Sequence, residues 1–561
     1  MRRLLCAVLL VVAGAQAQAG SDLIFSAGFE PISPDTNAEA GAFLWRATFG
    51  PTASDINDLE TNGYEAWVDR QMSLPPTLHL PQLQAFGESQ GQGERQRVWW
   101  NTAQNAPDQF RQRAAFALSQ ILVVSDLNGD LEGQPQALAA YYDLLVTNAF
   151  GNYRDLLEAV TLTPVMGHYL SMFRSTRFAA DSIEPDENYA REIMQLFSIG
   201  LEELNIDGSV RTQGGNPIPT YDQDDIVGLA EAFTGWNFAG ADQNDGNCEW
   251  WEWRWPEQNW LEPMEPCQVT DPNPGEQPDD YHVRTAKTIV GGVVLPAGQS
   301  AEQDMQQALN TLFNHPNVGP FLAFRLIQRL VTSNPSPQYI ARVAGVFNDN
   351  GSGVRGDLGA VFRAVLLDPD ALAGTAGNAT FGKLREPMFF QTQLNRVYNA
   401  QISPEFANNP DCCWPGAIYA PERFFGQAAL RSPSVFNFFK PNFAQPGPIE
   451  AQGLVSPEFE ISTETQVVGI ANFFFDTLTW GAPVPWQTQH ELQIGSLTAL
   501  AGNPTALVDR VNQDLLYGAL NPTARQIIID RISDIRPDNP DQRVAEALYY
   551  IITSPQSVVQ Q

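Results

Sequence analysis

The residues best suited to chemistry lie in the segment 187–192, where acids, an amide and an arginine fall on one predicted helix. Glu187 and Arg191 are four residues apart with the acid N-terminal, which is the favourable order for an ion pair. Asn188 and Glu192 share the same spacing, and Glu192 falls at the border of the apolar arc of the helix. We therefore expect its carboxylate to be at least half buried, and such a group needs a partner or a raised pKa.

Glu192 has two interpretations. In the functional one, supported by Asn188, it is a catalytic acid or base, or a metal ligand, that faces the next motif. In the structural one it bonds one helix to another, through Arg46 or Tyr221. We favour the structural interpretation, because structural interactions also perturb the pKa of a carboxyl group.

The next motif, residues 221–225, combines a tyrosine with three aspartates before a second predicted helix, 225–236. Asp225 is expected to cap that helix. Asp222 and Asp225 are candidate ligands for Ca²⁺, the one cofactor that the sequence suggests, although capping and the helix dipole explain the acids equally well. Tyr221 and Trp236, at the two ends of this region, are candidate binding residues.

A tryptophan-rich stretch follows, with Trp250, Trp251 and Trp253 between Cys248 and Cys267. Exposed tryptophans stack on sugar rings or anchor a protein partner, so a glycan is a candidate ligand. The same side chains could equally pack over the core, held there by a Cys248–Cys267 disulfide. That pair is the natural one among the four cysteines beyond the N-terminal segment, but Cys412 and Cys413 leave three connectivities open.

Apolar residues at helical spacing recur along most of the chain. The predicted helices are 54–59, 64–72, 110–124, 139–150, 153–163, 188–200, 225–236, 301–314, 318–332, 338–347, 358–367, 386–400, 464–479, 491–501, 506–516, 523–535 and 542–553. Strand signals are few, with 288–295 as the example, and residues 237–281 and 401–421 are irregular. The fold class is therefore mainly α, a large multi-helix domain with long irregular insertions and little β structure.

The N-terminus has the layout of a secretory signal peptide, with Arg2 and Arg3, an apolar run, and two overlapping Ala-x-Ala cleavage options that end at residue 19. We expect residues 1–19 to be the signal peptide, 20–38 a linker, 39–455 the main helical domain, and 456–561 a C-terminal helical segment packed on it. The protein is then exported, to the periplasm, the cell surface or the medium.

Charge narrows the range of partners. The chain of 561 residues carries 64 acidic and 32 basic residues, a net charge of −32. Nucleic acid would be repelled, so it is excluded as a partner. No apolar run in the mature chain reaches the length of about 18 residues that a transmembrane helix needs.

Several strings, read in order, resemble one family. They are residues 44–50, 187–192 with 196–201, 221–226 with 232–236, 350–358 with 366–369, 383–387, 430–436 and 554–555. Together they are similar to the bacterial family catalogued as domain of unknown function 1800, over nearly all of the mature chain. The resemblance implies an exported, mainly helical protein, and a partner from a second exported family with a phosphatase-like fold.

The same resemblance places His282 in a recurring segment and makes it, with Glu192, the second candidate catalytic residue. The family usually has His-Asp before a Lys-x-x-x-Gly step, whereas Val283 follows His282 here, ahead of Lys287 and Gly291. A function that needs the missing aspartate is therefore in doubt for this chain. The family supplies no catalytic assignment to carry over.

Two functions remain. The first is an exported envelope or secreted protein that acts by binding or assembly with a partner, since the sequence has no G-x-S-x-G, H-E-x-x-H or G-x-x-x-x-G-K motif. The alternative is an extracytoplasmic hydrolase with a carboxylate-based or metal-assisted site between the segments 187–192 and 221–225.

Overall fold

Helix starts in the C-terminal region follow one local rule, an asparagine cap followed by proline. The side chains of Asn503, Asn521 and Asn539 accept backbone N–H groups of α22 (Pro504–Leu516), α23 (Pro522–Asp534) and α24 (Pro540–Ile552). Proline is well placed at the first helical position because its missing N–H would have no partner there. These helices begin one or two residues before the predicted starts at 506, 523 and 542.

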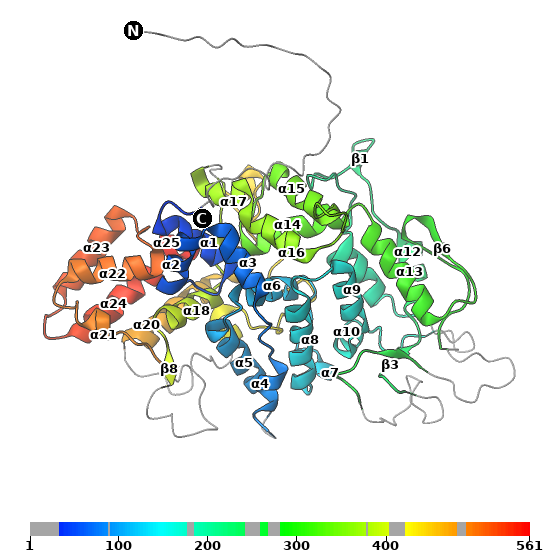
Figure 1. Ribbon diagram of the computed structural model, residues 1–561, viewed down its shortest axis with the longest axis horizontal. Helices are drawn as coiled ribbons and strands as arrows, with labels where there is room; N and C mark the ends of the chain where they lie inside the picture. Colours follow the sequence, from blue (N-terminus) through cyan, green and yellow to red (C-terminus); the bar gives the residue numbers. More distant parts are fainter. Residues whose placement is uncertain are drawn as a thin grey trace, which may run out of the picture.

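The computed structural model describes residues 33–87, 90–176, 184–241, 258–267, 281–376, 380–402, 421–479 and 490–560. Within these ranges helices dominate, as the sequence predicts (Figure 1). The other α-helices are α1 (Asn37–Ala47), α2 (Ala53–Asn62), α3 (Tyr64–Ser73), α4 (Leu80–Gln84), α5 (Gln92–Asn105), α6 (Gln109–Ser119), α7 (Gly129–Glu132), α8 (Pro135–Asn148), α9 (Tyr153–Leu162), α10 (Pro164–Tyr169), α11 (Asn188–Glu192), α12 (Gln223–Ala232), α13 (Ala301–Asn314), α14 (Val318–Leu330), α15 (Pro337–Asn348), α16 (Leu358–Leu367), α17 (Pro369–Ala373), α18 (Met388–Val397), α19 (Pro421–Phe425), α20 (Glu464–Thr479), α21 (Gly495–Thr498) and α25 (Pro555–Val558).

The β structure of the described residues consists of short antiparallel pairs. The pairs are β1 (Thr212–Gln213) with β2 (Asn216–Pro217), β3 (Trp236–Asn237) with β4 (Glu265–Pro266), β5 (Lys287–Ile289) with β6 (Val293–Leu295), β7 (Lys383–Leu384) with β10 (Val559–Gln560), and β8 (Gln401–Ile402) with β9 (His490–Glu491). The predicted strand 288–295 is thus a hairpin. The mainly α class with little β structure is confirmed.

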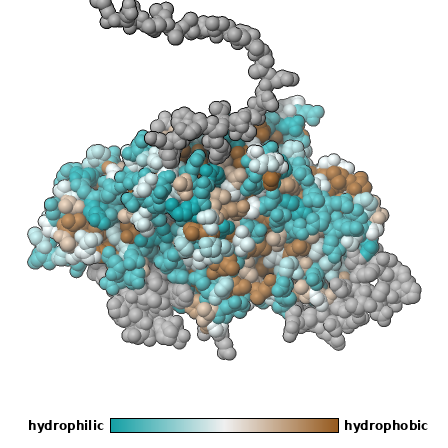
Figure 2. Space-filling view, in the orientation of Figure 1, coloured by the Kyte–Doolittle hydropathy of each residue, from teal (hydrophilic) through white to brown (hydrophobic). Residues whose placement is uncertain are grey.

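The molecule is elongated, with α20 to α24 at one end and α12, α13 and the β5–β6 hairpin at the other (Figure 1). A single cluster of buried apolar side chains includes residues of α1 and of α24, so the two ends of the chain contribute to one core. On the face drawn in Figure 2 hydrophilic residues predominate, and hydrophobic ones form scattered groups. The division into domains at residue 455 stays a prediction.

The predicted helices 110–124 and 225–236 end earlier than expected, at Ser119 and Ala232, so Trp236 lies in β3. Two further predicted helices differ in kind. The segment 188–200 is α11 followed by a π-helix, Ile193–Ser198, and not one continuous α-helix. Residues 491–501 contain only the short helix α21 and the end of β9. Among the described residues, no helix is long and apolar enough to cross a membrane.

Helix α12 packs so closely against β5 that only a glycine fits at residue 228. A Cβ atom there would lie 1.9 Å from the carbonyl oxygen of Thr288. Because that neighbour is backbone, it cannot rotate away. This close contact between Gly228 and Thr288 fixes α12, and with it the segment 221–225, against the β5–β6 hairpin.

Replacing Gly228 with Ala should therefore destabilise the fold by about 1–3 kcal/mol, the usual cost of overpacking. Gly345 is the matched control: it lies in α15, and a Cβ there meets nothing within 4 Å. Thermal unfolding should show a lower melting temperature for Gly228→Ala and an unchanged or higher one for Gly345→Ala. Equal melting temperatures for Gly228→Ala and the wild type would contradict the close contact.

Candidate functional site

Glu192 is the last α-helical residue before the π-helix. The π-turn is closed by hydrogen bonds from the backbone N–H groups of Ile199 and Gly200 to the carbonyl oxygen of Met194. Such turns are rare and often occur at functional sites. Glu192 is only 7% exposed, and its Oε2 atom is buried without a hydrogen-bond partner. The predicted burial of Glu192 is confirmed.

The surroundings of Glu192 favour its neutral form. Burial raises the pKa of Glu192 above its ordinary value, and the charge of Arg191 opposes this only in part. Burial also raises the pKa of Tyr169 to about 12 and raises that of Tyr221, and in both cases the nearby charge of Glu192 adds to the shift. A carboxyl group with a raised pKa keeps its proton to a higher pH than usual, which is a property that a general acid needs.

Of the two predicted partners of Glu192, Tyr221 lies near it and Arg46 does not belong to this site. The guanidinium of Arg46 instead donates from Nη1 to the carbonyl oxygen of Ala371 at 2.5 Å. The site therefore consists of Glu192 with Tyr169, from α10, and Tyr221, from the loop before α12. Tyr169 is a member that the sequence analysis missed.

Glu187 and Arg191 form the predicted ion pair, with 2.8 Å between Nη2 and Oε2. Gln223, in the first turn of α12, donates from Nε2 to both carboxylate oxygens of Glu187 at 2.9 Å. This pair thus ties α11 to α12. Asn188 is exposed, and its backbone N–H donates to Asp186 Oδ1.

The aspartates of the next motif cap α12. Asp222, and not Asp225, is the N-cap: its Oδ1 accepts the backbone N–H groups of Asp224 and Asp225, at 2.9 and 3.1 Å. Asp225 completes a capping box by accepting the backbone N–H of Asp222 at 3.0 Å. Among the described residues no group of three or more His, Cys, Asp or Glu side chains is placed to hold a metal ion. Calcium binding stays a prediction.

His282 belongs to a fully buried polar cluster. Its Nε2 lies 2.9 Å from Asp304 Oδ2, and its Nδ1 lies 3.0 Å from both the hydroxyl and the carbonyl oxygen of Thr234. Lys287 and Gln299 also donate to the Asp304 carboxylate. The side chains of His282, Lys287 and Asp304 are fully buried, and both ring nitrogens have partners.

Two opposing effects set the pKa of Asp304. Burial raises it, but hydrogen bonds from His282, Lys287 and Gln299 outweigh burial and hold the pKa below its ordinary value. The carboxylate that contacts His282 therefore comes from Asp304 in α13. It does not come from the next residue in the sequence, which is Val283. These contacts give His282 a structural role that holds β5 against α12 and α13; its catalytic role stays a prediction.

The remaining predicted residues divide into buried ones and ones outside the described ranges. Trp236 is buried, and its carbonyl oxygen accepts the backbone N–H of Arg174. Cys267 is buried beside Ala241 and Tyr281. Residues 1–32, 242–257 and 403–420 lie outside the described residues, so the signal peptide, Trp250, Trp251, Trp253, Cys248 and the Cys412–Cys413 pair stay predictions.

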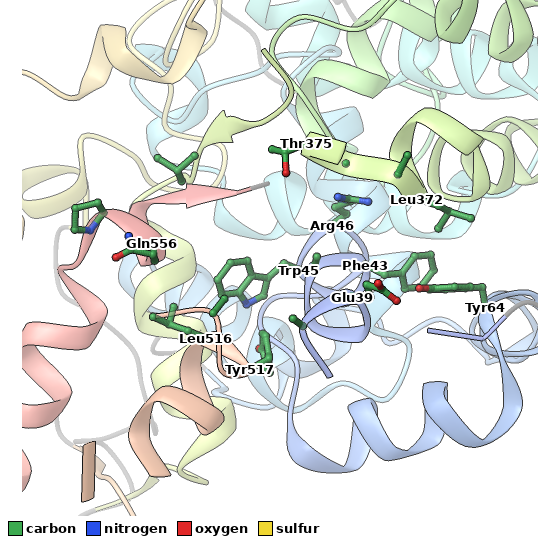
Figure 3. A pocket seen from close by; sticks show the side chains of 17 residues that line it. Glu39, Phe43, Trp45, Arg46, Tyr64, Leu372, Thr375, Leu516, Tyr517 and Gln556 are labelled. Atoms are coloured by element: carbon green, nitrogen blue, oxygen red, sulfur yellow. The ribbon is translucent and has the colours of Figure 1, made fainter. Parts of the chain in front are cut away.

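The structure adds a site that the sequence analysis did not find, a pocket between α1 and the C-terminal end of the chain (Figure 3). We call it the terminal pocket; its volume is about 470 Å³, and its lining includes Phe43, Trp45, Arg46, Tyr64, Tyr517 and Gln556. Trp45 and Arg46 belong to the string 44–50, which the sequence analysis used for the family resemblance, with Arg46 named besides only as a possible partner of Glu192.

Aromatic rings form the walls of the terminal pocket. Trp45 meets Tyr517 edge to face at a centroid distance of 5.6 Å, and Phe43 meets Tyr64 at 4.8 Å. The guanidinium of Arg385 covers the ring of Trp45 at 4.1 Å. Tyr517 has a positive φ of 55° because it is the left-handed C-cap that ends α22, and its backbone N–H donates to the carbonyl oxygen of Asn512.

Arg46 brings a positive charge to the terminal pocket. Burial lowers its pKa to about 10, and the phenols of Tyr339 and Tyr64 oppose the shift. Burial likewise raises the pKa of Tyr64 to about 12. At neutral pH the pocket therefore contains a charged guanidinium and a neutral phenol, and the exposed carboxyl group of Glu39 also lines it. The Oε1 atom of Gln556 is buried without a hydrogen-bond partner.

Fold and sites together define a mainly α-helical protein with a buried carboxyl group and a separate pocket of ligand size. The chain belongs to the family described as protein of unknown function (DUF1800), whose family model matches residues 42–559. No curated protein and no solved structure matches the chain.

Replacing Glu192 with Gln should stabilise the protein at neutral pH. A raised pKa means that the fold favours the protonated carboxyl, so stability falls as the pH rises from the ordinary value of 4.5 through the raised one. Gln resembles the protonated form. Thermal unfolding should show similar melting temperatures for Glu192→Gln and the wild type below about pH 4, and a higher one for the variant at pH 7.

Glu187→Gln is the control from the same segment. It removes an exposed ion pair, worth about 1 kcal/mol at most, and should give no gain in stability at any pH. A lower melting temperature of Glu192→Gln at pH 7 would mean that the folded protein holds an ionised, partnered Glu192, contrary to the account above.

Proposed function

We propose that the protein is exported and acts by binding a small ligand in the terminal pocket. The observation that carries the proposal is the pocket itself: a volume of about 470 Å³, aromatic walls and a buried arginine. Small-molecule sites in proteins have volumes of about 300–1,000 Å³, with mostly apolar walls and a few placed polar groups.

The lining suggests the chemistry of the ligand. The rings of Trp45, Tyr64 and Tyr517 suit a flat, apolar or aromatic body. The charge of Arg46 suits an anionic or hydrogen-bond-accepting end, because guanidinium groups have donors and no acceptor. Gln556 Oε1 suits an N–H or O–H donor on the ligand. We therefore propose an aromatic or amphipathic molecule with an acidic group.

Export is supported by the N-terminal sequence alone. Residues 1–19 have the basic start, apolar run and Ala-x-Ala sites of a signal peptide. A fusion of this segment to a reporter that is active only outside the cytoplasm should be active.

The proposal of a phosphatase-like partner rests on the family resemblance. Consistent recovery of the protein as a lone species from the envelope fraction would count against such a partner.

A hydrolase remains the second candidate function, favoured by one observation. Glu192 Oε2 is a buried, unpartnered carboxyl oxygen whose neighbours favour the protonated form, as a general acid requires. In that case Glu192→Gln should abolish turnover of an extracytoplasmic polymer while the protein stays folded. Turnover that persists in this variant would exclude Glu192 as the acid.

The terminal pocket can be tested with 1-anilinonaphthalene-8-sulfonate, a probe with aromatic rings and one sulfonate. Fluorescence titration and calorimetry should show one site with a Kd in the micromolar range, about −8 kcal/mol. Ala42 lines the pocket, and the larger side chain of Ala42→Phe should fill it and lower the affinity for the probe at least tenfold. Ala66 is the control, since it is exposed on α3 and does not line the pocket.

Ala66→Phe should leave the affinity for the probe unchanged. If Ala42→Phe folds normally and binds the probe as tightly as the wild type does, the terminal pocket is not the binding site. If the wild type shows no saturable binding of the probe, an aromatic acid is the wrong ligand class.

A further inference from the structure

A second pocket, separate from the terminal pocket, lies at the N-terminal end of α8, and its lining residues are of a different chemical kind. Three parts of the chain meet there: Gly87 and Gln90 before α5, residues 133–137 at the start of α8, and residues 258–261. Its volume is about 560 Å³. We call it the amide pocket, after the polar side chains that line it: Gln90, Gln134, Gln136, Gln258 and Asn259, together with Trp260.

None of the described residues that line the amide pocket carries a charge. This is notable in a chain with 64 acidic and 32 basic residues. A charged ligand would lose its hydration in this pocket without meeting a counter-ion, which is costly. The described part of the wall therefore favours a neutral ligand.

Carboxamide groups both donate and accept hydrogen bonds, and so do hydroxyl groups. The side chains of Gln134 and Asn259 form no hydrogen bond with other described residues, and Gln90 Oε1 is buried without a partner. Two neighbouring hydroxyl groups on a ligand can form hydrogen bonds with the oxygen and the nitrogen of one carboxamide. A site built from these half-exposed groups favours ligands with hydroxyls, and the buried Gln90 Oε1 would be left unpaired by a ligand without them.

Trp260 adds a flat surface that the protein holds in place. Its indole N–H donates to Gln258 Oε1 at 2.9 Å. Its ring packs against His168 at 4.5 Å and edge to face against Phe238 at 5.2 Å. Because these contacts fix the indole before any ligand arrives, little conformational entropy is lost on binding.

We propose that the amide pocket binds a neutral saccharide, with a sugar ring on Trp260 and its hydroxyls on the surrounding carboxamides. An aromatic platform and neutral groups that both donate and accept match the apolar faces and the many hydroxyls of an uncharged sugar. The open pocket accommodates a unit of a longer chain. This inference is independent of the ligand of the terminal pocket.

The test is calorimetry on the purified chain with four neutral probes, maltohexaose, cellohexaose, laminarihexaose and xylohexaose, and one charged probe, hexagalacturonate. At least one neutral probe should bind with a Kd between about 10 μM and 1 mM, and hexagalacturonate at least tenfold more weakly. Trp260→Ala and Gln134→Leu should each lower the affinity for the neutral probe that binds the wild type at least tenfold.

Two controls keep the test specific. Gln513→Leu, an exposed position on α22, should leave saccharide binding unchanged, and so should Ala42→Phe, which fills the terminal pocket. If Trp260→Ala fails to fold because its contacts with His168 and Phe238 are lost, Gln134→Leu still carries the test.

Three results would overturn the proposal. The first is that no neutral probe binds at about 5 mM, a concentration well above the Kd expected for a working site. The second is equal affinity of the wild type and of Gln134→Leu for the bound probe. The third is hexagalacturonate binding as tightly as the neutral probes do.

Discussion

The contact between Gly41 and Tyr517 is the constraint on which the terminal pocket depends. A Cβ atom at residue 41 would lie 1.9 Å from Cδ2 of Tyr517, so the ring packs directly on the backbone of α1. The phenol oxygen lies 3.3 Å from Gln393 Nε2, which places the ring between α1 and α18. The contact joins α1 to the end of α22, two elements that lie more than 450 residues apart in the sequence.

Other contacts of the C-terminal end reinforce this closure. Strand β10 pairs with β7, and Gln560 donates from Nε2 to the carbonyl oxygen of Leu330 at 2.7 Å. Arg385, which covers the ring of Trp45, also donates to the carbonyl oxygen of Ser557 at 3.0 Å. The terminal pocket is thus a product of tertiary closure, with walls from both ends of the chain and from residues 372–375. This explains how its lining can be aromatic although no single segment of the sequence looks like a binding site.

Local patterns in the sequence predicted the helices and the ion pair of Glu187 with Arg191, because both depend on residues a few positions apart. They misplaced the cap of α12, since Asp222 and Asp225 are both good caps and only the backbone geometry distinguishes them. The π-turn after Glu192 and the Asp304 partner of His282 depend on packing, so no spacing rule indicated them. The terminal pocket was missed for the same reason, although Trp45 and Arg46 stand in a string that the resemblance singles out.

The most direct test of the account is the effect of Gly41→Ala on both stability and probe affinity, with Gly93→Ala as the control. A Cβ at Gly93, in α5, meets nothing within 4 Å. Because the ring of Tyr517 must move, Gly41→Ala should lower the melting temperature and weaken 1-anilinonaphthalene-8-sulfonate at least tenfold, while Gly93→Ala changes neither beyond a small gain in stability. Wild-type stability and affinity in Gly41→Ala would contradict the claim that this contact forms the pocket.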